Sequence, residues 1–487
     1  HARRAREQLD GAQRHEPAAV VAIAAPLAVL FGDLSDTAGG LSVLDLADAV
    51  AEQRVVPGHA LLRHLGAVRY AMLANEGDSR LATSQRKTLD AVYGDALRAY
   101  PLTRVRLGLG AGAHNYFRAE YEAAVQATIE TEALCERRFG ERAPCLAEAL
   151  NLRGINRSSQ ERNDEVLAIY RTALGVREQI FAPGHTLITE LYHNLAVTLH
   201  DMGRYDLAES YGRRALAADR TLYGDDHTEV ASDLSTLAAV LRSMGDARGA
   251  IELLEEAVAI NTRQLGGRHQ RTAVMHYSLG QAQLEAGDHA GALANFETSG
   301  RIYRAVDPEH RSVPITQHGM AKAALGLERY ALARRTLLEV LERYLDIYGE
   351  GHRNVASAYR DLADAERALG QLKSAETYLL KSLTALTQGD ALEVRWRSLL
   401  SLARLDDALE RPESALFFGK LSISALQDLR ATQGSLDRRL RRTFARQRSD
   451  SYRTVSAWLV DASRVLEAQR VLDLLKDEEY FEFTRRS

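Results

Sequence analysis

The chain has 487 residues, of which 26% are charged and 46% hydrophobic, and its formal net charge at pH 7 is −4. This is the composition of a soluble, helix-rich protein with ample core, and so small a net charge indicates no particular class of partner. Only two cysteines are present, Cys135 and Cys145, which excludes a cysteine-rich scaffold and a zinc site. We therefore expect reduced thiols in a cytoplasmic protein, although a bridge between the two across one loop stays open.

The N-terminal segment combines a basic start with an apolar run. Because the first residue is His1 and not Met, we expect a fragment or a processed piece. Residues 17–31, PAAVVAIAAPLAVLF, are shorter than the ~20 residues that cross a bilayer, and Pro26 interrupts them. No small-residue cleavage site follows, so a secretory signal is the less favoured alternative. We predict a buried element and no membrane partner.

Three helices are expected before residue 100. LSVLDLADAVAEQ predicts one helix between loop signals that include Gly39–Gly40 and Pro57–Gly58, and residues 60–100 predict two more. The sequence YGD at 93–95 is similar to a loop that recurs later in the chain. We interpret residues 1–105 as a helical capping region or degenerate repeats that cover an apolar end, with a separate small domain as the alternative.

Three glycines, Gly108, Gly110 and Gly112, invite a phosphate-loop interpretation. A phosphate loop needs a preceding strand and a following helix N-terminus, whereas the repeat pattern places these glycines inside a helix. We predict that they permit close helix packing.

From residue 106 to 422 the sequence repeats with a period of 42 residues, which gives about eight repeats. The pattern is clearest from Glu190 to Ala231, where apolar residues recur three or four apart on both sides of Gly203. Each repeat is therefore predicted to be two amphipathic helices joined by a short turn, with small residues where the helices cross. Equivalent residues in three successive repeats are Leu195, Ala196, Gly203, Ala208 and Ala215; Leu237, Ala238, Gly245, Ala250 and Ala257; and Leu279, Gly280, Gly287, Ala292 and Ser299.

Five histidines follow the same period, each between two repeats. They are His185, His227, His269, His310 and His352, spaced 42, 42, 41 and 42 residues apart. Histidine is a metal ligand and a pH switch, but successive repeats lie about one helix diameter, ~10 Å, apart, so no two of these side chains can share a metal ion. We predict that each makes a hydrogen bond from its loop to the next helix.

The stretch LAVTLHDMGRYDLAES, followed by Ala215, resembles the tetratricopeptide repeat (TPR). Repeats of 42 residues with the loops Tyr223–His227 and Tyr348–His352 are similar to those of kinesin light chain and of bacterial repeat proteins. The resemblance covers roughly residues 106–422. It implies an all-α fold, a right-handed α-solenoid of TPR helical hairpins with atypical helical caps at both ends, but no particular ligand.

The same resemblance implies that the first helix of each repeat lines a peptide-binding groove. The groove positions lean polar and basic, which suits an acidic peptide or a terminal carboxylate, because arginine donates to both carboxylate oxygens. A solvated helix face is the alternative. Asn194 also resembles the asparagines with which kinesin light chain repeats hold a peptide backbone, although only one repeat keeps it. The predicted groove residues are His193, Asn194, Val197, His200, Arg242, Tyr277, Gln281, His318, Lys322, Arg360, Asp364 and Arg367.

No enzyme signature is present in the sequence. Neither Gly-x-Ser-x-Gly nor His-Glu-x-x-His occurs, and no Cys and His are placed as a protease pair. We expect no catalytic residue, no cofactor and no metal in this chain.

Residues 423–487 are predicted to form long helices outside the repeats. Between Gln427 and Arg448 there are seven arginines and two aspartates. With Phe444 as the lone aromatic residue, this stripe favours a charged helix face or an interdomain contact, and nucleic acid is not an expected partner.

The last stretch, Ser463–Arg486, resembles the junction between the repeats and the caspase-like protease of bacterial TPR-CHAT proteins. That resemblance implies a regulatory scaffold that senses or docks a protein partner and controls a protease domain in cis, whose His and Cys lie outside this chain. A stand-alone adaptor like kinesin light chain is the alternative. A binder of nucleic acid or of a guide complex through the arginine stripe is a third.

Overall fold

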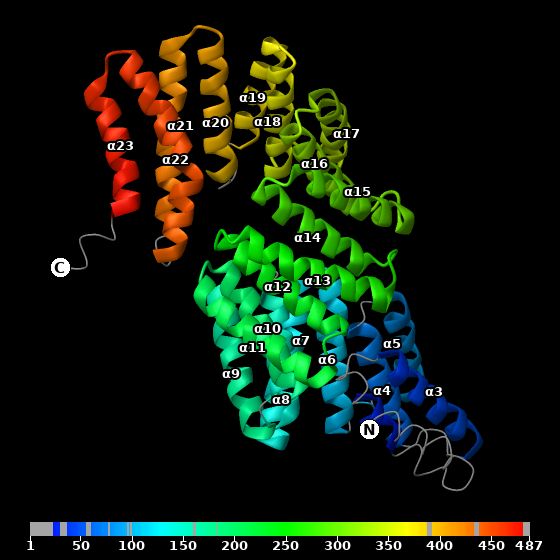
Figure 1. Cartoon of the computed structure of the whole chain (residues 1–487). Coiled ribbons are helices and arrows are strands. Elements are labelled where there is room, and N and C mark those ends of the chain that lie inside the picture. The colour runs from blue at the N-terminus through cyan, green and yellow to red at the C-terminus, as the bar shows by residue number, and fades with distance from the viewer. Residues whose placement is uncertain are drawn as a thin grey trace, which may run out of the picture. The chain divides into compact units, whose positions relative to one another are not determined.

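The computed structural model describes residues 23–480, except residues 30–36, 55–59, 76–77, 95–96, 98–99, 159–161, 183, 387–391 and 433–437. Every regular segment in the described range is helical (Figure 1), so the predicted all-α repeat fold is confirmed. No described helix combines the length and apolar character that crossing a bilayer requires. The chain divides into two compact bodies, an N-terminal body (His1–Met202 with Ala217–Leu222) and a C-terminal body (Gly203–Leu216 with Tyr223–Ser487).

The C-terminal body is a succession of helix pairs, each made of a first and a second helix. After α11 (Tyr205–Tyr223), which the two bodies share, it contains α12 (Thr228–Ser243), α13 (Ala247–Leu265), α14 (Gln270–Ala286), α15 (His289–Val306), α16 (Ser312–Gly326), α17 (Tyr330–Tyr348), α18 (Arg353–Ala368), α19 (Leu372–Ala385), α20 (Leu392–Ala408), α21 (Pro412–Thr432), α22 (Arg438–Asp461) and α23 (Val465–Tyr480).

First helices of neighbouring pairs also contact one another. Such contacts join α12 with α14, α14 with α16, α16 with α18, and α18 with α20. Within the described residues no comparable contact joins the second helices α13, α15, α17 and α19. The first helices are therefore the closely spaced side of this body, as the predicted first-helix groove requires.

The periodic small residues lie where the two helices of a pair cross. Ala250, Ala292 and Ala333 are fully buried there. Where the period brings a serine to the second helix, its hydroxyl donates to a carbonyl of the first helix: Ser299 to Ala273 at 2.7 Å and Ser382 to Ala356 at 2.8 Å. The small side chain thus permits close approach of the two helices, and its hydroxyl has a hydrogen-bond partner within the protein.

The turn between the two helices uses a left-handed backbone position. Gly245, Gly287 and Gly370 have φ of 80°, 83° and 76° there. One period further on, Glu328 and Glu410 adopt φ of 58° and 56°. Glycine is favoured at this left-handed position because it lacks Cβ. The same turn also forms with glutamate there, so the packing of the two helices determines its conformation.

Four of the five periodic histidines lie immediately before first helices, and His310 lies two residues before α16. In each, the ring Nδ1 accepts a hydrogen bond from the backbone N–H two residues later, at 3.1–3.3 Å. The predicted loop-to-helix hydrogen bond is confirmed in all five loops; four of the histidines are N-cap residues, and His310 bonds the first amide of α16 from the position before the N-cap.

The N-terminal body begins with a helical turn at 23–29, whose alanines 24, 25 and 28 are buried against α3 and α4, so that part of the predicted buried element is confirmed. Gly39 and Gly40 lie buried inside α3, which already begins at Thr37, so the loop expected there is wrong. Its helices are α3 (Thr37–Arg54), α4 (Ala60–Asn75), α5 (Ser79–Tyr93), α6 (Pro101–Phe117), α7 (Tyr121–Phe139), α8 (Pro144–Ser158), α9 (Asn163–Ile180) and α10 (Thr186–Asp201).

The three glycines of α6 serve close packing, as predicted. A Cβ at Gly110 would lie 2.6 Å from ring carbons of Tyr70 on α4, and one at Gly112 would lie 2.7 Å from the methyl of Thr128 on α7. Because both neighbours are buried, only glycine fits. These residues are part of helix–helix contacts and do not form a phosphate loop.

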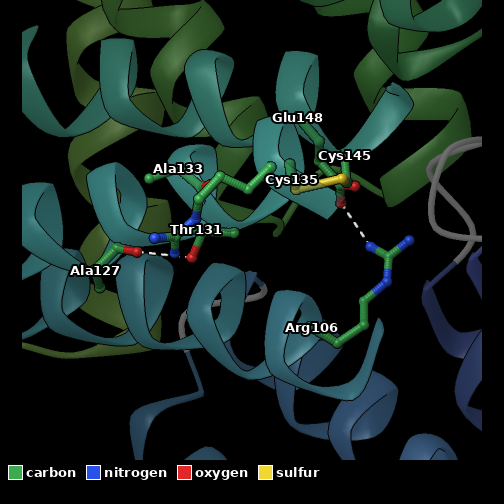
Figure 2. The surroundings of a disulfide bond; sticks show 8 residues. Arg106, Ala127, Thr131, Ala133, Cys135, Cys145 and Glu148 are labelled. Carbon is green, nitrogen blue, oxygen red and sulfur yellow. Dashed lines mark hydrogen bonds and ion pairs between the residues drawn. A yellow bond between two sulfur atoms is a disulfide. The ribbon is translucent and has the colours of Figure 1, made fainter. Parts of the chain in front are cut away.

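The two cysteines form a disulfide between α7 and α8, with Cα atoms 6.0 Å apart (Figure 2). The expectation of reduced thiols is therefore wrong for this structure. The loop after Gly140 turns the chain so that Cys145 faces the fully buried Cys135, and this separation is typical of a bridge. Beside it, Arg106 on α6 donates to Glu148 on α8 at 2.7 Å (Figure 2).

Candidate functional site on the first helices

The twelve predicted groove residues all lie on first helices, in two separate sets. His193, Asn194, Val197 and His200 are on α10 in the N-terminal body. The other eight are on α12, α14, α16 and α18 in the C-terminal body.

On α10, Asn194 is already engaged within the protein. Its amide donates to Asn151 on α8 at 3.0 Å, and Asn151 donates to Glu190 at 2.7 Å. Arg177, which is 1% exposed, pairs with Glu190 at 3.1 Å. This chain of contacts joins first helices, so binding of a peptide backbone by Asn194 stays a prediction. Of the other three, Val197 is exposed and the His200 ring lies 3.2 Å from a carboxylate oxygen of Asp201.

On α12 and α14 the predicted residues also pair within the protein. Arg242 donates to Glu285 at 3.0 Å, with both side chains partly exposed. Gln281 donates to the Tyr277 hydroxyl at 2.7 Å, and burial raises the pKa of Tyr277. This part of the surface is polar and has its hydrogen bonds made.

Between α16 and α18 lies a buried charged cluster centred on Asp361. His318 Nε2 lies 2.8 Å from one carboxylate oxygen, and Arg360 donates to the other at 2.9 Å. Burial alone would raise the pKa of Asp361, but Arg360 and His318 hold it well below its usual range. Tyr344 on α17 reaches the other ring nitrogen of His318 at 3.4 Å. His318 therefore joins α16 to α18, and Arg360 is held by Asp361 on its own helix.

Lys322, one turn beyond His318, differs from these neighbours. It is half-buried, and in the described part of the chain its ammonium has no hydrogen bond and no ion pair within 4 Å. Burial lowers the pKa of Lys322; Asp361 opposes this, while Arg360 and Arg397 lower the pKa further. A cation that has lost water without gaining a partner is a candidate contact for an anion.

Asp364 and Arg367 complete the predicted set on α18. Burial raises the pKa of Asp364, which hydrogen-bonds to Ser401 on α20. Arg367 is exposed at the end of the helix.

The cluster continues onto α20 and α22, which the prediction had not included. Glu393 accepts from Trp396 at 3.1 Å and from Arg448 at 3.0 Å, and pairs with Arg397 at 2.7 Å. Burial would raise the pKa of Glu393, but Arg397 and Arg448 hold it below its usual value. Arg448 is the last residue of the arginine stripe; the side chains of residues 430–447 lie outside the described residues.

The polar contacts between first helices share one spacing in the sequence, which was not part of the prediction. Asn151–Asn194, Arg242–Glu285 and His318–Asp361 are each separated by 43 residues, one period plus one residue. Polar pairs at this spacing identify the partners of the predicted groove residues.

A family model described as tetratricopeptide repeat matches residues 187–262, 234–305 and 312–388. The chain contains tetratricopeptide repeats. These matches include the helices that carry Arg242, His318, Lys322 and Asp361.

Solved structures support the same fold. A Rap protein complexed with competence and sporulation factor is 13% identical, covering 76% of this chain and 99% of that chain with a TM-score of 0.54. The apo form of the quorum sensor NprR from B. thuringiensis is 14% identical, covering 74% of this chain and 97% of that chain with a TM-score of 0.57. Kinesin light chain TPR-like repeats from Podosopora anserina are 19% identical over 41% of this chain and 94% of that chain, with a TM-score of 0.37. Such likenesses show fold alone, and the last is too weak to support an argument. Comparison with curated proteins gave no match.

Proposed function

We propose that this chain is a protein-interaction scaffold whose first-helix surface, in the C-terminal body, binds an acidic side chain or a terminal carboxylate of a protein partner. The TPR match supports an interaction role, because stacked helical pairs expose a long surface and carry no chemistry of their own. No catalytic step is part of the proposal.

The Lys322 ammonium is the observation that carries this proposal. Its neighbours His318 and Arg360 already satisfy Asp361, so they have little left to offer a ligand. Lys322 is half-buried and has gained no partner among the described residues, and burial lowers its pKa. A carboxylate would supply the missing counter-charge.

Charged groups of both signs surround Lys322. Arg360 and Arg397 act on Lys322 as like charges, whereas Asp361 and Glu285 act on it as opposite charges. Arg397 is 45% exposed and can reorient toward a ligand, whereas Arg360 is held by Asp361. Lys322 and Arg397 are therefore the two groups that we expect to contact the partner.

The test compares peptide binding by the full chain and by Lys322→Met. A synthetic library of random octapeptides with free C-terminal carboxylates supplies the ligands, and fluorescence anisotropy gives Kd. We expect acidic peptides to bind and Lys322→Met to weaken binding by at least ~30-fold, because the carboxylate loses its buried partner. The same peptides with a C-terminal amide separate recognition of the terminus from recognition of a side chain.

The matched control is Lys373→Met. Lys373 is an exposed lysine on the second helix α19, away from the first-helix surface, so this variant should bind like the parent. Equal binding by Lys322→Met and Lys373→Met would contradict the proposal.

The proposal extends to regulation. The resemblance of Ser463–Arg486, most of which is α23, to the TPR-CHAT junction supports control of a caspase-like protease in cis by partner binding. Sequencing the native gene beyond the codon for Ser487 tests this extension. A following segment of ~250 residues with a His and a later Cys would support it. An immediate stop codon would favour a stand-alone adaptor.

A further inference from the structure

Five inter-repeat loops place the same unusual acceptor, a histidine ring, at the start of a first helix; the ring belongs to the N-cap residue in four of them and to the residue before the N-cap Arg311 in α16. The usual capping residues are Ser, Thr, Asp and Asn, whose side-chain oxygens do not titrate near neutral pH and therefore accept the hydrogen bond throughout that range. Here Nδ1 of the ring accepts instead. The bonds are Leu187 N to His185 at 3.3 Å, Glu229 N to His227 at 3.2 Å, and Arg271 N to His269, Ser312 N to His310 and Asn354 N to His352 at 3.1 Å.

Four of the five rings are also held by stacking on an aromatic residue from the end of the preceding helix. The stacked pairs, with ring centroids 4.1–4.8 Å apart, are Phe181–His185, Tyr223–His227, Tyr303–His310 and Tyr348–His352. Only His269 lacks such a pair among the described rings. Stacking fixes the ring plane, so Nδ1 stays directed at the helix N-terminus.

This geometry requires a neutral imidazole. Because Nδ1 accepts, the single proton must be on Nε2. A second proton would occupy Nδ1, remove the acceptor, and place a positive charge at the positive end of the helix dipole. Protonation therefore abolishes the cap and adds a repulsion.

We propose that the five loop histidines are acid-sensitive helix caps, so that a fall in pH loosens the inter-repeat loops they close. The device is repeated in both bodies, because His185 belongs to the N-terminal body and the other four to the C-terminal body. A fall in pH therefore loosens several loops at the same time. This effect does not depend on the binding site proposed at Lys322.

The charged groups around the caps mostly favour the neutral ring. Burial lowers the pKa of His185, His227 and His352. Arg177 on α9 lowers the pKa of His185 further, and Arg353 on α18 does the same for His352. At His227, Glu229 on α12 opposes the lowering. Other charged groups next to the loops form ion pairs, including Arg263 with Asp226, Arg271 with Glu229 and Arg343 with Glu309. The Nε2 atom of His310 lies 3.3 Å from the side-chain amide nitrogen of Gln270.

The direction of the pH effect follows from these lowered values. The unfolded chain binds protons at histidine near pH ~6.5, before the folded chain does. Stability from the caps at His185, His227 and His352 is therefore fully present above pH ~6.5 and is lost progressively as the pH falls toward their lowered folded-state pKa.

The experiment measures thermal unfolding of the full chain at pH 7.5 and pH 5.5, against a variant with Asp at all five positions. An aspartate caps the same amide and remains ionised at pH 5.5. We expect the parent Tm to fall by roughly 2 °C more than the variant Tm for each cap lost. Equal falls in the two proteins would overturn the proposal.

Two further measurements keep the test decisive if the fivefold variant does not fold. In the single variants His227→Asp and His352→Asp, amide-exchange protection of Glu229 and Asn354 should become insensitive to pH between 7.5 and 5.5, while the parent loses protection. The control His200→Asn removes a first-helix histidine that caps nothing, and its pH response should match the parent. Ring 15N shifts that place the proton on Nδ1 at pH 7.5 would also overturn the proposal.

Discussion

Two carboxylates in different parts of the molecule respond to burial in opposite ways. Asp361 lies between α16 and α18 and Glu132 lies on α7, with side chains 6% and 12% exposed, and each is within ion-pair distance of an arginine. Yet the pKa of Asp361 is far below its usual range, whereas burial raises that of Glu132 to about 7.

The number of donors explains the difference. Both oxygens of Asp361 are engaged, one by His318 and one by Arg360. Glu132 pairs through one oxygen with Arg153 at 2.8 Å; its other oxygen is buried without a hydrogen bond in the described part of the chain, and Glu136 adds a like charge. The single ion pair of Glu132 does not compensate for the hydration that its carboxylate loses on burial, whereas the two donors at Asp361 do.

The largest expected effect comes from Asp361→Ala. It leaves the buried Arg360 guanidinium and His318 without their acceptor, so the free energy of unfolding should fall by about 3–5 kcal/mol. Urea unfolding of the full chain at pH 7.5 measures it. Because the folded-state pKa is lowered, this contribution is present above pH ~3.9 and is lost as the pH falls below it. A loss under about 1 kcal/mol at pH 7.5 would show that the donors do not depend on Asp361.

Glu132→Gln should act in the opposite direction. The folded state disfavours the ionised carboxylate, so stability falls as the pH rises from the ordinary pKa of glutamate toward about 7. Replacing it with the neutral amide should stabilise the protein at pH 8 by at most about 3 kcal/mol, and the gain should shrink toward zero at pH 5. Urea unfolding at the two pH values measures this difference. If the variant is less stable than the parent at pH 8, the Arg153 pair outweighs burial and the comparison fails.

Glu285→Gln is the small-effect reference. Glu285 and Arg242 join neighbouring first helices at the same 43-residue spacing as His318 and Asp361, but their side chains are 40% and 24% exposed. We expect a loss below about 1 kcal/mol that disappears in 1 M NaCl, because exposed pairs are hydrated and screened. A loss as large as that of Asp361→Ala would mean that spacing, and not burial, sets the energy.

The sequence by itself determined the helical pairs, their period and their caps. Leu195, Ala208 and Gly203 recur in fixed register, and a pattern that repeats every 42 residues can bury its apolar faces only by stacking. The histidines were correctly placed as loop-to-helix contacts for the same reason, since each lies one or two residues before a first helix. These features are local, and local spacing encodes them.

Only the tertiary structure decided which polar residues are engaged and which are free. His318, Arg360 and Lys322 look alike in the sequence, as polar groups on first helices, but two of them are held by Asp361 and the third has no partner among the described residues. The bridge between Cys135 and Cys145 likewise depends on how one loop turns. Charge and burial are properties of neighbours brought from different helices, so a single helix pattern cannot fix them.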